Sequence, residues 1–182
     1  GTYQSACLAK HMVDYENIYI VDTLTAAAGI RLLCEVAINW IGENRCVEDI
    51  VSGLEELKER VHIYAGLDTL EYLAKGGRIS KTAAAIGTLA SIKPIICVDH
   101  GEVVVAGKTR GVNKATSVVC EKMQSDIVDT LYPVYTLYSY GLENVEKLES
   151  KLDLDVNRVR IGSTIGVHIG PNAFGVCFVS KL

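Results

Sequence analysis

A short apolar run between two helical patterns is the feature that most limits how this chain can fold. Residues 18–22 read Ile-Tyr-Ile-Val-Asp, which is typical of a buried strand. Before this run, Leu8, Met12 and Tyr15 recur at helical spacing, and a second helical pattern begins at Thr25. A buried strand between helices is typical of a parallel sheet that helices cover on both faces. The sequence therefore predicts an α/β fold for the start of the chain.

The same rhythm continues as far as residue 65. We expect the second helix to end at Gly42 with a left-handed cap, a third helix to carry an apolar stripe from Val47 to Val61, and a short strand to follow at 62–65. A right-handed crossover into the strand at 18–22 needs an earlier strand, and the chain starts with a helix instead. We therefore expect the front of this first domain to be missing.

From Gly66 onward the pattern is that of an α+β unit. Asp68 and Glu71 have the spacing of a capping box, the glycine pair at 76–77 should end that short helix, and Ser80 can cap a helix that follows it. The later patterns predict a hairpin and then alternating helices and strands, with strands at 93–98, 102–106, 134–139, 158–162, 164–169 and 174–179. We expect a largely antiparallel sheet here, and we divide the chain into domains 1–65 and 66–182.

Charge and composition exclude several classes of function. The net charge is -4 and the 18 basic residues are scattered, which argues against a nucleic-acid partner. No apolar stretch reaches the roughly 20 residues of a membrane-spanning helix. The cysteines are widely spaced without a C-x-x-C pair, which favours buried thiols in a cytoplasmic protein over a metal site; they are Cys7, Cys34, Cys46, Cys97, Cys120 and Cys177.

Four residues invite a functional interpretation, and each also has a structural one. Thr2, at a helix start, could bind an anion or act as an ordinary cap. Arg78 follows a glycine pair in a loop that would suit a carboxylate or a phosphate. Arg110 could form a second anion contact or a surface salt bridge. His168 lies between two β-branched residues, so in a strand it needs a polar partner on its own face, and a structural histidine satisfies this as well as a functional one does.

Neither a metal site nor a catalytic triad is predicted. The remaining histidines are not spaced as metal ligands and do not stand beside a nucleophile with a carboxylate; they are His11, His62 and His100.

Several motifs in order along the chain resemble the DegV family of fatty-acid-binding proteins. The longest is GLDTLEYLAKGGRIS at 66–80, which is followed by IKPI at 92–95. The start GTYQSA at 1–6 is similar to the family's Ser-Gly-Thr-Tyr-Gln segment without its serine, KTR at 108–110 matches a basic strand end, and VHIGP at 167–171 matches a His-x-Gly-Pro-Gly turn. The family usually has glycine where this chain has Asn172, and asparagine tolerates a positive φ better than other non-glycine residues.

The resemblance implies a function and a set of binding residues. It implies a two-domain protein that buries a long-chain fatty acid such as palmitate between its domains, has no other cofactor, and presents the carboxylate to the catalytic subunit of a fatty acid kinase. The carboxylate would lie near Thr2, with Arg78, Arg110 and His168 around it. The protein would not itself be an enzyme. Without its front part, the chain alone should bind the lipid weakly or not at all.

Two alternatives remain open at this point. The first is an enzyme that acts on a phosphorylated small molecule, with Arg78, Arg110 and the helix start at Ser80 as an anion clamp and His168 as acid or base. The second is a regulatory module whose apolar groove binds a helix of a partner protein.

Overall fold

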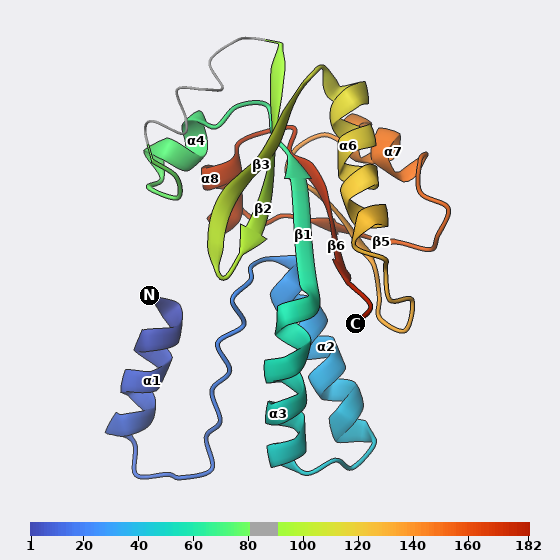
Figure 1. Cartoon of the computed structure of the whole chain (residues 1–182). Coiled ribbons are helices and arrows are strands. Elements are labelled where there is room, and N and C mark those ends of the chain that lie inside the picture. Colours follow the sequence, from blue (N-terminus) through green and yellow to red (C-terminus); the bar gives the residue numbers. More distant parts are fainter. Residues whose placement is uncertain (81–90) are drawn as a thin grey trace.

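The fold was determined from a computed structural model of the 182-residue chain, which describes residues 1–80 and 91–182 (Figure 1). The helix expected after Ser80 lies outside the described residues. In chain order the elements are α1 (Thr2–Met12), α2 (Ala28–Gly42), α3 (Val47–Leu57), the 3-10 helix η1 (Lys58–Arg60), β1 (Val61–Gly66), α4 (Glu71–Lys75), β2 (Ile92–Asp99), β3 (Glu102–Arg110), α6 (Val112–Ser125), β4 (Tyr135–Tyr138), α7 (Glu143–Glu149), β5 (Asn157–Arg160), α8 (Ser163–Ile169) and β6 (Phe174–Val179).

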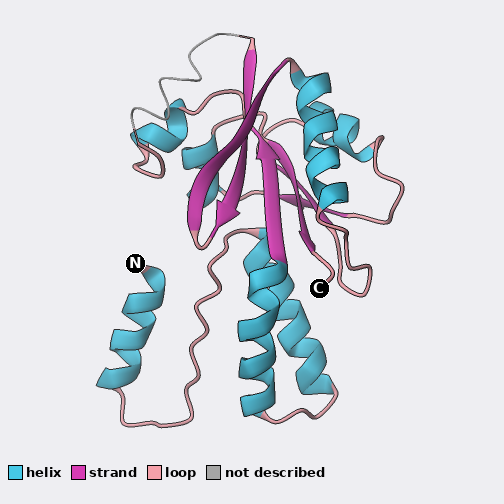
Figure 2. Cartoon of the chain, in the orientation of Figure 1, coloured by secondary structure: helices cyan, strands magenta, loops and turns pink. Residues whose placement is uncertain are grey.

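A single six-stranded sheet organises the described part of the chain (Figure 2). Its strand order is β3-β2-β1-β6-β4-β5. Every neighbouring pair is antiparallel except β4 with β5, which is parallel. The predicted α/β class with a largely antiparallel sheet is therefore confirmed.

Strand β1 lies in the middle of this sheet. Tyr64 pairs with Cys97 of β2 on one side and with Val176 of β6 on the other, both in antiparallel register. The sequence prediction assigned residues 62–65 to the first domain. Since both neighbours of β1 come from the second half of the chain, we propose that the second unit begins with β1 at Val61 and not at Gly66.

Two predicted strands are wrong. Residues 18–22 lie in the connection between α1 and α2 and pair with no strand among the described residues. An apolar run becomes a strand only where a neighbour accepts its backbone hydrogen bonds, and the described part of the chain offers none here. Residues 164–169 form helix α8, because Ile165 and Ile169 lie one helical turn apart and pack together against α4.

Two predicted helix caps also differ from the structure. Helix α2 does end at Gly42, but the left-handed residue that follows it is Asn44, with φ of 61°. At α4 the hydroxyl of Thr69, and not Asp68, accepts the backbone N–H of Glu71 at 3.2 Å. The predicted stop after α4 is confirmed by Gly77, which has φ of 69°.

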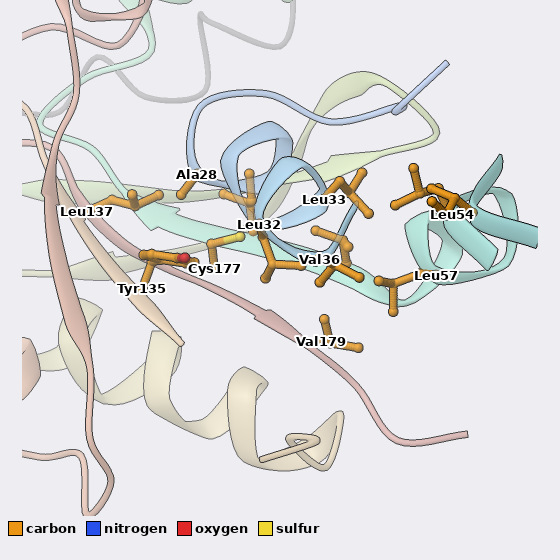
Figure 3. Close-up of a cluster of buried hydrophobic side chains, with 13 residues drawn as sticks. Ala28, Leu32, Leu33, Val36, Leu54, Leu57, Tyr135, Leu137, Cys177 and Val179 are labelled. Carbon is orange, nitrogen blue, oxygen red and sulfur yellow. The ribbon is translucent and has the colours of Figure 1, made fainter. Parts of the chain in front are cut away.

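The two faces of the sheet carry different helices. Tyr64 of β1 packs toward α6 and α7, whereas its neighbours Ile63 and Ala65 face the opposite side. On that opposite side, α2 and α3 cover one end of the sheet, where Leu32 and Leu57 pack with strand residues (Figure 3). Helices α4 and α8 cover the other end. Helix α1 buries no residue and stands apart from the sheet in Figure 1.

Candidate ligand-binding site

Arg78 is positioned by the turn that ends α4. Its backbone N–H donates to the carbonyl of Leu73 at 2.8 Å and that of Gly77 donates to Ala74 at 3.1 Å, which is the Schellman pattern that a left-handed glycine permits. The guanidinium Nη1 donates to the carbonyl of Gly76 at 2.7 Å, and the side chain is otherwise exposed. Among the described residues, the other guanidinium donors have no partner.

His168 lies in the last turn of α8, against the same glycine. A Cβ atom added to Gly76 would lie 2.0 Å from Nδ1 of His168, so the imidazole rests directly on the glycine backbone. This Nδ1 atom is buried and has no hydrogen-bond partner among the described residues. The structure thus brings together two of the four predicted residues, Arg78 and His168, with Gly76 between them.

Arg110 lies on the same face of the sheet, at the end of its edge strand. It pairs with Ile92 of β2. Alternate residues of a strand point to the same face, so Ile92 shares the face of Ile96, which packs with α4 and α8. Opposite residues of an antiparallel pair also share a face, which places exposed Arg110 on the side of α4 and α8.

Thr2 is not brought to this group by any hydrogen bond among the described residues. It is exposed in the first turn of α1, whose cap residue is Gly1. In Figure 1 the N-terminal end of α1 is the end nearer to the sheet.

A cavity of about 870 Å³ lies beside Arg78, between the segment after α4 and the start of β3. Val104 lines this cavity, and so does an apolar wall of Ile79, Val103 and Val105, which also packs against the buried cluster of α4 and α8. Arg78 and Glu102 are its charged lining residues. A volume of this size is in the range of small-molecule sites in proteins.

The hairpin turn at the cavity has a fixed shape. His100 and Gly101 both have positive φ, 45° and 82°, as a two-residue type I′ turn requires. Leu24, in the connection before α2, lies in van der Waals range of Gly101, since an added Cβ would be 3.5 Å from its Cδ2. The segment after α1 therefore reaches the rim of the cavity.

The sequence prediction missed the apolar wall and one polar contact. The sequence shows that Val103 and Val105 lie on the same face of a strand. It does not show that this face borders a cavity. Asp68 was assigned to a cap, whereas it accepts hydrogen bonds from Lys93 and Asn172. The predicted tolerance of Asn172 for the turn is confirmed by its φ of 58°.

The arrangement suits a molecule with an anionic head and an apolar tail. A guanidinium offers several donors to a carboxylate or phosphate, and apolar side chains line the same cavity. The described residues contain no cluster of three or more metal-ligating side chains. Within the same residues, no helix combines the length and the apolarity that crossing a bilayer takes.

Comparison with known proteins gives a match along almost the whole chain. Residues 1–181 match the model of a family described as "Uncharacterised protein, DegV family". Among curated proteins, a DegV domain-containing protein of Clostridium acetobutylicum is 33% identical over 184 residues, covering 100% of this chain and 66% of the relative. The chain spans about two thirds of the length of the curated relatives it matches.

Solved structures give the same result. A DegV lipid-binding protein from Thermotoga maritima superposes with a TM-score of 0.87 and 27% identity, covering 99% of this chain and 64% of that one. A DegV family protein from Thermus thermophilus, whose structure is described by its fatty acid binding, gives a TM-score of 0.87 and 29% identity over 100% of this chain and 67% of that one.

Proposed function

The chain belongs to the DegV family, and from this premise we propose that it binds a long-chain fatty acid such as palmitate. The acyl chain would lie along the wall of Ile79, Val103 and Val105, and the carboxylate would lie at Arg78. The two structural relatives, one described as lipid binding and the other by its fatty acid binding, support this assignment.

One observation carries the proposal. A single cavity combines a guanidinium, several of whose donors have no partner in the described part of the chain, with an apolar wall that packs against a buried cluster. An amphiphilic ligand is the class of molecule that uses both features at once.

The energetics fit this division of roles. Burial of about 14 methylenes at about 0.8 kcal/mol each contributes on the order of 11 kcal/mol before the costs of association. A carboxylate brought out of water without donors would cost several kcal/mol, so charged donors must meet it. Affinity therefore comes mainly from the tail, while the head-group residues set the orientation.

The head-group residues extend the proposal. Arg78 and His168 meet at Gly76, and Arg110 lies on the same face of the sheet. We assign these three residues and Thr2 to the carboxylate. We further propose that the protein is cytoplasmic and binds the lipid between two domains. It would present the carboxylate of the lipid to the catalytic subunit of a fatty acid kinase and would not catalyse a reaction itself.

The test is made on the natural protein that contains this sequence, purified from the cells that express it. Denaturing extraction followed by mass spectrometry should recover a long-chain fatty acid in about equimolar amount. Delipidated protein should show a higher melting temperature when palmitate is added, because a ligand that binds only the folded state stabilises it. Recovery of no fatty acid, with no thermal response to palmitate, contradicts the proposal.

A pair of variants locates the site. Arg78→Gln should weaken palmitate binding by about tenfold, since it removes a charge-assisted contact. Arg45→Gln is the matched control, because Arg45 lies between α2 and α3 and pairs with Glu43. An equal loss in both variants would mean that the carboxylate does not lie at Arg78.

A second pair of variants tests the apolar wall. Val105→Asp should abolish binding because it places a charge against the acyl chain. Val47→Asp makes the same change at an exposed position in the first turn of α3 and should leave binding intact.

A further inference from the structure

Three chain segments meet at Asp68, for a reason that lies in the sheet topology. β1 is antiparallel to both of its neighbours, so the end of β1 lies beside the start of β2 and the start of β6. Asp68 follows the end of β1, Lys93 lies at the start of β2, and Asn172 lies two residues before β6. The carboxylate of Asp68 therefore links the start of β2 to the turn that precedes β6.

The two oxygens of this carboxylate have different partners. Oδ1 accepts from Nζ of Lys93 at 2.7 Å, and Oδ2 accepts from Nδ2 of Asn172 at 2.8 Å. Burial alone would raise the pKa of Asp68, but the hydrogen bonds from Lys93 and Asn172 and the charge of Lys93 outweigh it and hold the pKa below its ordinary value. Asp68 is thus an ionised bridge.

The Asn172 side of this bridge holds the turn between α8 and β6. Gly170 and Asn172 both have positive φ in that turn, 76° and 58°. From the other side, Nδ2 of Asn144 donates to the carbonyl of Asn172 at 3.0 Å. Ser139 donates to the carbonyl of Gly170 at 2.8 Å and accepts from the backbone N–H of Ala173 at 3.0 Å. These side-chain hydrogen bonds fix the direction of the turn.

The turn at Gly170 begins two residues after His168. Asp68 lies just before α4, and Arg78 follows α4. At the interface of α4 and α8, Gly170 lies against the ring of Tyr72, which a Cβ added to the glycine would approach to 2.4 Å. His168 lies against Gly76 in the same way. The bond between Asp68 and Asn172 therefore ties the segment that carries His168 to the segment that carries Arg78.

We propose that Asp68, through Asn172, is a positioning residue that sets His168 beside Arg78 for recognition of the fatty-acid carboxylate, an inference that rests on the proposed function. Asp68 does not touch the ligand in this scheme. We expect its effect to fall mainly on the head group, because neither Asp68 nor Asn172 lines the cavity that holds the apolar wall of Ile79, Val103 and Val105.

The test compares two ligands that share a tail and differ in the head, palmitate and hexadecanol. Asn172→Gly removes the hydrogen bond to Asp68 and keeps the positive φ, since glycine adopts it freely. Asp68→Asn removes the charge and keeps the shape. Asn44→Gly is the matched control, because Asn44 also has positive φ but lies after α2.

We expect Asn172→Gly and Asp68→Asn to weaken palmitate binding by about five- to tenfold and to leave hexadecanol binding unchanged. Asn44→Gly should change neither. Equal weakening of both ligands would mean a general loss of structure, and unchanged palmitate binding would mean that the bridge does not position the head group. Either result overturns the inference.

A measurement without ligand separates this inference from the proposed function. The imidazole NMR signals of His168, assigned by their absence in His168→Gln, should shift in Asn172→Gly and stay in place in Asn44→Gly. Unchanged signals would overturn the positioning role even if palmitate binds. A shift in protein that binds no palmitate would overturn the proposed function and leave the structural role of the bridge supported.

Discussion

At the scale of single residues, the tightest packing contact of the site is that between Gly76 and His168. Gly76 has φ of -79°, which alanine adopts without strain, and the three atoms nearest to an added Cβ all belong to the imidazole of His168. We expect Gly76→Ala to lower the free energy of unfolding by about 2 kcal/mol through overpacking. Urea denaturation measures this loss.

A double-mutant cycle isolates the contact. In the background of His168→Ala, the cost of Gly76→Ala should fall below about 1 kcal/mol, because the opposing ring is gone. Equal costs in the two backgrounds would show that the glycine is needed for another reason.

His62, on the opposite face of the sheet, should make the stability of the chain depend on pH. Its ring packs on Phe178 at a centroid distance of 5.4 Å, and its Nε2 lies 3.0 Å from the hydroxyl of Ser180. Burial lowers the pKa of His62 below its ordinary value of 6.5, and the charge of Asp126, 3.9 Å from Nδ1, opposes this only in part.

The sign of the effect follows from proton binding. As pH falls through 6.5, the unfolded chain takes up a proton on His62 before the folded chain does, so the free energy of unfolding decreases. We expect the urea midpoint to fall between about pH 7.5 and about pH 5.5, and His62→Gln to reduce that slope. The paired carboxylates with lowered pKa, such as Asp68 and Glu149, titrate below this window. An identical slope in the variant would rule out His62 as the source.

At the scale of elements, the hairpin of β2 and β3 allows a clean comparison of two glycines. Gly101 has φ of 82°, and a Cβ there meets Leu24 only at ordinary contact distance, 3.5 Å. Gly101→Ala should therefore cost about 1–2 kcal/mol from backbone conformation alone. Gly107→Ala, in β3 of the same hairpin, is the control, since a Cβ there finds its nearest atom at 4.0 Å, and it should change stability by less than about 0.5 kcal/mol. Thermal or urea unfolding of both variants decides the point, and equal costs would contradict the turn assignment.

The elements that could be predicted from the sequence are those with a local signal. The stripe that starts at Val47 predicted α3, and the turn at 99–101 predicted the hairpin, because spacing and turn residues suffice for both. The β-branched residues around His168 favoured a strand, yet packing against α4 makes that segment a helix. Residues 18–22 have a strand composition without a strand partner. Tertiary contacts decided both cases.

The candidate site was predictable to a similar extent. The glycine pair before Arg78 indicated an anion-binding loop. The structure adds the turn geometry, in which several guanidinium donors of Arg78 have no partner among the described residues. The contact of His168 with Gly76 joins positions that lie far apart in the chain, so no local pattern could reveal it. The same holds for the bond between Asp68 and Asn172.

At the scale of the whole molecule, packing is unevenly distributed between its parts. β6 is buried along its full length between β1 and β4. α1 buries no residue, and its Leu8 and Met12 are 63% and 78% exposed. Because local opening costs little where few contacts are lost, the two elements should differ widely in stability.

Amide hydrogen exchange of the 182-residue chain tests this contrast. We expect the amides of β6 and its neighbour β1 to exchange only through global unfolding, so that their opening free energy equals that of the molecule. The amides of α1 should exchange with almost no protection, because an isolated 11-residue helix is marginal in water. An added denaturant should then accelerate exchange in β6 and leave α1 unaffected, since only global opening exposes much surface. Strong protection of α1 would mean that its exposed apolar residues are covered in solution. The oligomeric state of the chain should then be measured, because self-association could cover them.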